Sequence, residues 1–170
     1  TLLSKSLRPL AEKFHGITDP EVIAKQRYLE IISNENSRDV FKKRIIILKS
    51  IREYLQNNGF VELETPILQN IACGANARPF ITHHNTLNED FYLRIAPELY
   101  VKKAVAAGFD KVFEIGKNFR NEGMDSSHLQ EFTMIEWYAA YWDYLKNMDF
   151  PCELLKKLVE TINGDLKLDY

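Results

Sequence analysis

The chain has 170 residues, of which 45% are hydrophobic and 27% are charged, and its formal net charge at pH 7 is -2. This composition is typical of an ordinary soluble globular protein, and it provides no overall positive field that would attract nucleic acid. Cys73 and Cys152 lack the spacing of metal ligands, which indicates free thiols in a reducing compartment. We see no signal peptide and no apolar run that could span a membrane, so we expect a cytoplasmic protein without a membrane partner.

The first third of the chain is predicted to be helical. Asp19 directly before Pro20 is a favourable helix start and predicts a helix to about Ile32. The polar run at residues 33–37 is expected to be a connector. Apolar residues then recur at helical spacing and predict a longer helix over residues 39–56, whose apolar stripe faces either the core or a second subunit. The stripe consists of Phe41, Ile45, Leu48 and Leu55.

The remainder of the chain mixes strands and helices without regular alternation. Runs rich in β-branched and aromatic residues predict strands over residues 60–63, 80–86, 91–95, 112–119 and 132–141. Helices are expected at about 97–107 and 151–162. Hairpin-like neighbouring strands favour an α+β fold, with a mostly antiparallel sheet flanked by helices.

One strand-loop-strand segment carries most of the recognisable chemistry. Arg120 offers a planar fork of donors for a phosphate or a carboxylate, and Phe132 offers a ring on which a purine can stack. Glu136 and Tyr138 are two residues apart in an extended run, so their side chains leave the same face. This mix indicates a site for a nucleoside triphosphate beside a small charged substrate. The alternative is a surface ion pair between Arg120 and Glu122, with Phe132 and Trp137 in the core.

Two segments resemble motifs of the class II aminoacyl-tRNA synthetases. Phe-Arg-Asn-Glu at residues 119–122, then a loop that contains His128, then Glu-Phe-Thr at residues 131–133, is similar to motif 2. Gly-Phe-Val-Glu-Leu-Glu-Thr-Pro-Ile-Leu at residues 59–68, after a long amphipathic helix, resembles motif 1, which in that family lies at a dimer interface. Between them, residues 72–85 and 92–100 are similar to lysyl-tRNA synthetases rather than to the aspartyl or asparaginyl enzymes.

The resemblance implies a role for each matching residue. Arg120 would act in catalysis by bridging the α-phosphate of ATP and the carboxylate of lysine. Glu122 would contact the edge of the adenine, Phe132 would stack on it, and His128 would approach the outer phosphates. The implied lysine-binding positions are Gly74, Glu98, Glu136 and Tyr138. A ligand with two ammonium groups and one carboxylate suits a site with several acids and one Arg.

The resemblance also implies an activity and partners. Lysine and ATP would give lysyl-adenylate and pyrophosphate, and the lysyl group would pass to tRNA(Lys). A homodimer would form through the motif 1 region. ATP and Mg²⁺ are the implied cofactors. Two alternatives remain open, a synthetase-like lysyl transferase that modifies a protein and a noncatalytic module for dimerisation or regulation.

The domain organisation is expected to be incomplete. Residues 1–16 look like a linker from a missing N-terminal OB anticodon-binding domain, and residues 17–170 like the N-terminal portion of the catalytic domain. Nothing after Tyr144 resembles the Gly-rich third motif, so we expect little or no activity from this chain alone. The magnesium ligands are expected in the missing C-terminal part, and no metal ligand is assigned to this chain.

Overall fold

The structure is a computed structural model that describes residues 1, 3–5, 7 and 16–167. The linker expected over residues 1–16 therefore lies mostly outside the described residues. The chain divides into two compact units, residues 1–50 with 157–170 and residues 51–156. In chain order the elements are α1 (Pro20–Lys25), α2 (Arg27–Ser33), α3 (Glu35–Asn57), β1 (Val61–Glu62), β2 (Leu68–Gln69), β3 (Ile81–His84), β4 (Glu89–Leu93), α4 (Glu98–Ala106), β5 (Lys111–Phe119), β6 (Glu131–Ala139) and α5 (Tyr144–Asn163).

In the first unit, the helix expected up to Ile32 is two short helices, α1 and α2. The predicted start is confirmed, because the Asp19 carboxylate accepts a hydrogen bond from the backbone N–H of Glu21 at 2.8 Å and caps α1. The break falls at Gln26, whose φ of -130° and ψ of 50° lie outside the helical region. The pattern of apolar residues continues across this single residue and does not reveal it.

The polar connector expected at residues 33–37 is wrong, since α3 already begins at Glu35. The Asn34 side chain accepts a hydrogen bond from the backbone N–H of Asn36 at 3.0 Å, as capping residues do at helix starts. Ser37 lies inside α3 and donates to the buried carboxylate of Glu30 in α2. Polar side chains here form a helix boundary rather than a loop.

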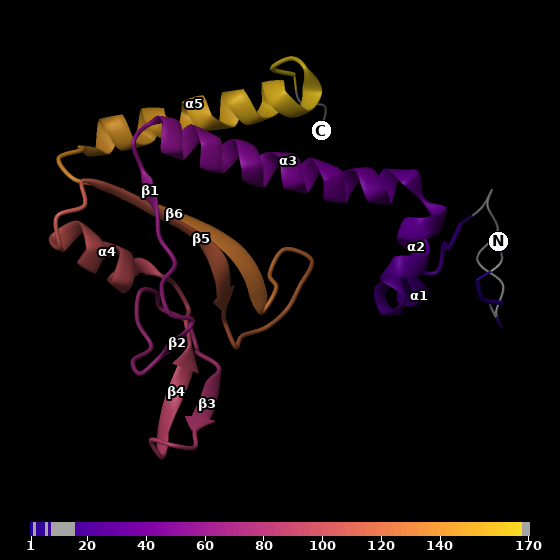
Figure 1. The fold of residues 1–170 in the computed structure, drawn as a ribbon, viewed down its shortest axis with the longest axis horizontal. Helices are drawn as coiled ribbons and strands as arrows, with labels where there is room; N and C mark the ends of the chain where they lie inside the picture. Colours follow the sequence, from indigo (N-terminus) through magenta and orange to yellow (C-terminus); the bar gives the residue numbers. More distant parts are fainter. Residues whose placement is uncertain (2, 6, 8–15, 168–170) are drawn as a thin grey trace. The chain divides into compact units, whose positions relative to one another are not determined.

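The second unit contains two three-stranded sheets (Figure 1). In the first, β5 lies between β1, which is parallel to it, and β6, which is antiparallel. In the second, β4 pairs antiparallel with both β2 and β3. The α+β class with mostly antiparallel pairing is confirmed. The sequence does not predict strand β2, which is only two residues long.

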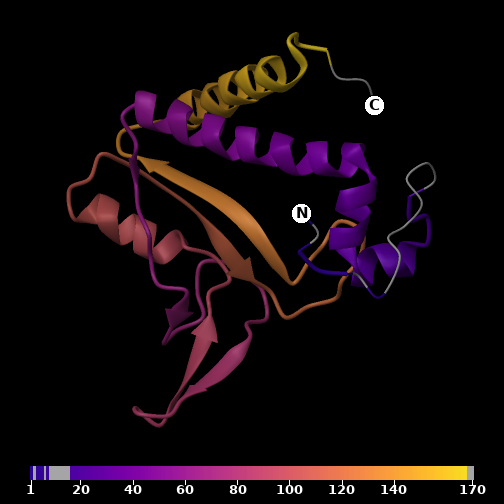
Figure 2. The same ribbon diagram turned by 45° about the vertical axis from the view of Figure 1, so that its right-hand side comes forward.

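The register of the β5–β6 hairpin decides which side chains reach each face. Phe113 pairs with Trp137 and Ile115 with Ile135, and this face packs in the hydrophobic core around Leu55, Phe60 and Phe150. Directly paired residues share a face and neighbours alternate. The opposite face therefore carries Glu114, Gly116 and Asn118 of β5 with Phe132, Met134, Glu136 and Tyr138 of β6. Figure 2 shows the two long strands side by side.

Helix α5 begins well before the predicted start at Pro151. The side chain of Asp143 accepts a hydrogen bond from the backbone N–H of Lys146 at 2.8 Å and caps the new start. Pro151 then lies inside the helix, where it removes one helical hydrogen bond. Phe150, directly before it, packs in the aromatic core with its ring centroid 5.1 Å from that of Trp142. Among the described residues, no helix combines the length and apolarity needed to cross a membrane.

Candidate functional site

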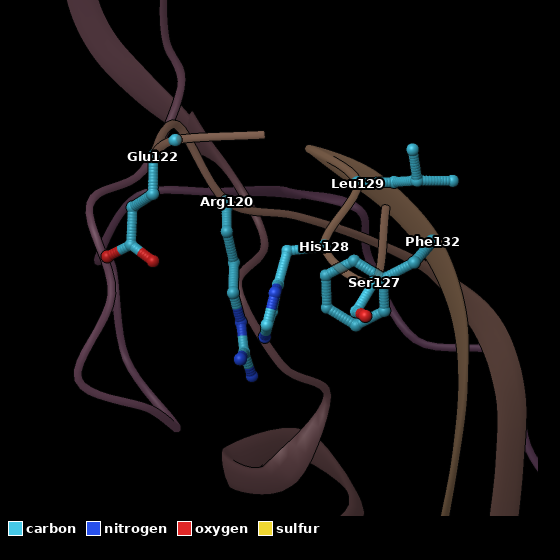
Figure 3. Close-up of a pocket in the computed structure, with 7 residues that line it drawn as sticks. Arg120, Glu122, Ser127, His128, Leu129 and Phe132 are labelled. Carbon is cyan, nitrogen blue, oxygen red and sulfur yellow. The ribbon is translucent and has the colours of Figure 1, made fainter. Parts of the chain in front are cut away.

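A pocket of about 330 Å³ opens where the loop of residues 120–130 joins β5 to β6. Its lining includes all four residues for which we predicted nucleotide contacts. Figure 3 shows Arg120 and His128 extending into this space, with Glu122 on one side and Phe132 on the other. The full lining is Arg120, Glu122, Gly123, Ser127, His128, Leu129 and Phe132.

Arg120 directly follows β5 and is held by the hairpin. Its backbone N–H donates to the carbonyl of Gln130 at 2.8 Å, and its Cζ lies 5.2 Å from the centroid of the Phe132 ring. Its Nε is buried and finds no hydrogen-bond partner among the described residues. Asn118, two residues earlier, is fully buried, and its amide atoms also lack partners there. This end of the hairpin therefore has unused hydrogen-bonding capacity, which suits a polar ligand.

Glu122 holds the loop to the segment that precedes β3. One of its carboxylate oxygens accepts a hydrogen bond from the backbone N–H of Arg78 at 3.1 Å. The carbonyl of Arg78 accepts from the backbone N–H of Asn121 at 2.8 Å, and the carbonyl of Glu122 accepts from the Gln130 side chain at 2.8 Å. These bonds fix the backbone on both sides of Arg120.

His128 is oriented by Asp125, a residue that the sequence analysis did not single out. The Asp125 carboxylate accepts hydrogen bonds from the backbone N–H groups of Ser127 at 2.7 Å and His128 at 2.8 Å, and it lies 2.8 Å from Nδ1 of the His128 ring. The Ser127 N–H and the His128 ring hold the pKa of the Asp125 carboxyl below its usual value. Because Nδ1 is engaged, Nε2 is the nitrogen left to contact a ligand. An Asp three residues before a His in a polar loop is the available sequence signal.

The four positions predicted for lysine binding also lie together. The hydroxyl of Tyr138 donates to Glu136 at 2.8 Å, and burial raises the pKa of both groups. The negative charge of Glu98, at the start of α4, raises both pKa values further. Gly74 has a φ of +91°, and a Cβ there would lie 3.2 Å from the Cβ of Glu98 and 3.1 Å from that of Ala96. Glycine is therefore needed for the chain to pass beside the acidic cluster, which consists of Glu98, Glu136 and Tyr138.

A buried ion pair that the sequence analysis missed supports both groups of residues. Arg94, directly after β4, pairs with Glu114 of β5, and their side chains are only 2% and 4% exposed. The Arg94 guanidinium also donates to the carbonyls of Lys117 at 2.8 Å and Thr65 at 3.2 Å. The Thr65 hydroxyl donates to the second Glu114 oxygen at 2.6 Å. One guanidinium thus connects the two sheets of this unit.

Gly116 makes room for this ion pair. A Cβ at position 116 would overlap Nη2 of Arg94 and would lie 3.3 Å from its Cζ. The backbone also contributes, because the N–H of Phe119 donates to the carbonyl of Arg94 at 2.9 Å. Since Phe119 precedes Arg120, the buried network sets the position of the residue expected to bind phosphate.

The described residues do not by themselves gather a metal site, as they contain no group of three or more His, Cys, Asp or Glu side chains that could hold an ion. His83 Nδ1 lies 3.0 Å from Asp90 on the neighbouring strand, and the His84 ring packs against Phe91.

Comparison with known proteins follows the same outline. The family model described as tRNA synthetases class II (D, K and N) matches residues 19–169. Relatives named lysine–tRNA ligase include that of Clostridium botulinum, 55% identical over 169 residues, which are 99% of this chain and 34% of the relative. The relative from Thermotoga maritima is 55% identical over 170 residues, 100% of this chain and 34% of its own length. The relative from Aquifex aeolicus is 53% identical over 169 residues, which are 99% of this chain and 28% of the relative. The chain thus spans about a third of the length of these relatives.

Proposed function

Because this chain belongs to the class II tRNA synthetases of the D, K and N group, we propose that it serves in the activation of L-lysine by ATP and in lysyl transfer to tRNA(Lys). The observation that carries the proposal is the placement of two subsites on one face of the β5–β6 hairpin. Arg120 and Phe132 lie at the loop end, and Glu136 and Tyr138 lie further along β6. The relatives named lysine–tRNA ligase support lysine as the amino acid.

The proposed reaction needs no nucleophile from the protein. A carboxylate oxygen of lysine forms a bond to the α-phosphorus of ATP, the bond from that phosphorus to the oxygen leading to the β-phosphate breaks, and pyrophosphate leaves with those electrons. Arg120 holds the lysine carboxylate and the α-phosphate together and opposes the charge that develops. Phe132 stacks on the adenine, Glu122 contacts its edge, and His128 meets the outer phosphates. The family implies ATP and Mg²⁺ as cofactors, and the chain's own share of the reaction is to bind, orient and neutralise charge through these side chains.

Selection of lysine over other amino acids follows from the negative charges of the acidic cluster. The ammonium groups of the substrate face Glu98 and Glu136, and the hydroxyl of Tyr138 holds the Glu136 carboxylate in place. An amino acid without the side-chain ammonium leaves a carboxylate unpaired in a half-buried site. Discrimination of this type reaches roughly 10⁴-fold.

The proposal extends to partners and location. A homodimer would form through the motif 1 region, where Val61, Ile67 and Leu68 expose apolar side chains. tRNA(Lys) would be the acceptor, and the cytoplasm would be the compartment. The division into a linker at residues 1–16 and a catalytic portion at residues 17–170 stays a prediction.

The test is amino-acid-dependent ATP–pyrophosphate exchange by the full gene product and by this chain, with lysine, aspartate and asparagine. We expect exchange with lysine only, little or none from this chain alone, and a loss of roughly 100-fold or more in the Arg120→Lys variant of the full protein. Lys117→Arg is the matched control, because Lys117 lies on the same strand and its side chain is 51% exposed.

Three results would contradict parts of the proposal. Exchange with aspartate or asparagine would overturn the choice of lysine. Exchange without charging of tRNA, but with lysine transferred to a protein, would favour the protein-modifying transferase. Absence of exchange in both proteins would favour the noncatalytic module.

A further inference from the structure

A lysine side chain of the protein itself lies against the acidic cluster. Lys102, one turn after Glu98 in α4, forms an ion pair with the Glu98 carboxylate. The same ammonium lies 5.7 Å from the centroid of the Tyr138 ring, within the range of a cation–π contact. Its positive charge also acts on Glu136, the partner of Tyr138. One ammonium thus acts on both carboxylates to which we assign the ammonium groups of the substrate, and on the tyrosine that holds one of them.

We propose that Lys102 is a specificity-determining residue. It takes the place of a substrate ammonium in the acidic cluster and is displaced when lysine binds. The inference rests on the proposed function. Without Lys102, Glu98 and Glu136 would stand close together as two uncompensated negative charges, since Glu98 raises the pKa of Glu136 and Lys102 lowers it. Lys102 relieves this repulsion. A ligand that displaces it must bring an ammonium of its own.

The two ion pairs of this region differ in the way that the inference requires. The Arg94 and Glu114 side chains are almost fully buried and hold several further hydrogen bonds, so that pair is locked. The Lys102 and Glu98 side chains are 55% and 33% exposed. Exposed pairs between residues i and i+4 of a helix are weak and cost little to open. A flexible lysine stem can move its ammonium into solvent, whereas the Arg94 guanidinium has no such exit.

Lysine binding to the full gene product, measured by isothermal titration calorimetry, tests the inference. Removal of the competing ammonium in Lys102→Met should lower the Kd for lysine by about two- to fivefold, the range of an exposed ion pair. Lys103→Met is the matched control, because it removes the same charge from the next residue of α4, whose ammonium lies 5.0 Å from the Tyr100 ring. Lys102→Arg, which keeps a cation, should bind lysine close to the wild-type value.

The outcomes separate the inference from the proposed function. Tighter binding in Lys102→Met than in Lys103→Met supports displacement. Equal affinities in the two variants would overturn it, since the effect would then be one of overall charge. Weaker binding in Lys102→Met would overturn it too, because Lys102 would then orient Glu98 rather than compete for it. Lysine-dependent pyrophosphate exchange by the wild type is measured first, and its absence refutes the proposed function instead.

Discussion

Substitution of Gly116 by Ala should disrupt the buried ion pair without removing any polar group. The added methyl would overlap Nη2 of Arg94, and it would lie 3.3 Å from both the Arg94 Cζ and a Glu114 oxygen. Since the Arg94 side chain is 2% exposed, the guanidinium has no free space to enter. It would leave the carbonyls of Lys117 and Thr65 and would leave the Glu114 carboxylate buried without its cation.

The expected loss in the free energy of unfolding is about 3–5 kcal/mol, the usual cost of breaking a buried ion pair. That is a large share of the roughly 5–15 kcal/mol that keeps a typical domain folded. Urea unfolding of the full gene product, followed by circular dichroism, measures it. Gly123→Ala is the matched control, because nothing lies within 4 Å of a Cβ at that position, and it should change stability by less than about 0.5 kcal/mol.

A double-mutant cycle identifies the cause. In a background that carries Arg94→Met with Glu114→Met, the charged pair is replaced by apolar side chains, a change that proteins often tolerate. Gly116→Ala should cost much less there, because the flexible Met side chain can move aside. The same large loss in both backgrounds would refute the reasoning, since the clash would then be with something other than the Arg94 guanidinium.

Two further predictions concern the subsites. Phe132→Ala should weaken ATP binding by roughly 10- to 100-fold, since stacking of a base on an aromatic ring is worth about 1–3 kcal/mol. Leu129→Ala in the same pocket should have little effect. Calorimetry with ATP measures both variants, and equal losses of affinity would argue against stacking. Tyr138→Phe should raise the pKa of Glu136 by removing the hydrogen bond that lowers it, while Glu98, Glu114 and Lys102 remain in place. In the proposal, lysine binds the ionised carboxylate. As the pH is lowered, the affinity for lysine should therefore begin to fall at a higher pH in Tyr138→Phe than in the wild type. Tyr141→Phe, at a fully exposed residue, should leave the Kd–pH profile unchanged. An unshifted profile in Tyr138→Phe would refute the assigned hydrogen bond.

The same raised pKa has a consequence for folding. The Glu136 carboxyl is half-buried, and its pKa in the folded protein lies above the ordinary value of 4.5. Protonated Glu136 therefore favours the folded state. The contribution of protonated Glu136 to the free energy of unfolding is complete below about pH 4.5, and it is lost as the pH rises through the raised pKa. The folded protein is thus less stable when Glu136 carries the charge proposed to bind lysine. Such a trade-off between function and stability is usual at polar sites.

The grouping of the four residues expected to contact ATP was predictable because they are close in the chain. Arg120, Glu122, His128 and Phe132 lie within one strand-loop-strand segment, so a single hairpin brings them together whatever the rest of the fold. The grouping of Glu98 with Glu136 could be reached only through the family resemblance, since no local pattern joins α4 to β6. The structure brings these residues together, and their roles as ligand contacts stay predictions.

The buried ion pair and several element boundaries could not be predicted from the sequence. Arg94 and Glu114 are far apart in sequence, and a charged residue in a strand-like run is usually an exposed one. Pro151 predicts a helix start because proline favours the first turn, but burial of Phe150 in the aromatic core outweighs the lost helical hydrogen bond. In both cases tertiary packing overrides a local preference, and tertiary packing is what a single sequence does not show.

The register of the β5–β6 hairpin decides whether the side chains proposed to contact ATP and those proposed to contact lysine lie on the same face of the sheet. Phe132 and Glu136 are four residues apart on β6 and lie on the same face, about 13 Å along the strand at the usual rise per residue. This separation suits the proposed extended ligand, with its base at Phe132 and its ammonium at Glu136, and the Arg120 guanidinium supplies a cation beside Phe132. A slip of one residue in β6 would turn Phe132 and Glu136 to the core face and Trp137 to the site. The aromatic core around Phe113 and Phe150 forbids that slip, because it would bury a carboxylate among rings. Packing on one face of the sheet therefore specifies the chemistry on the other.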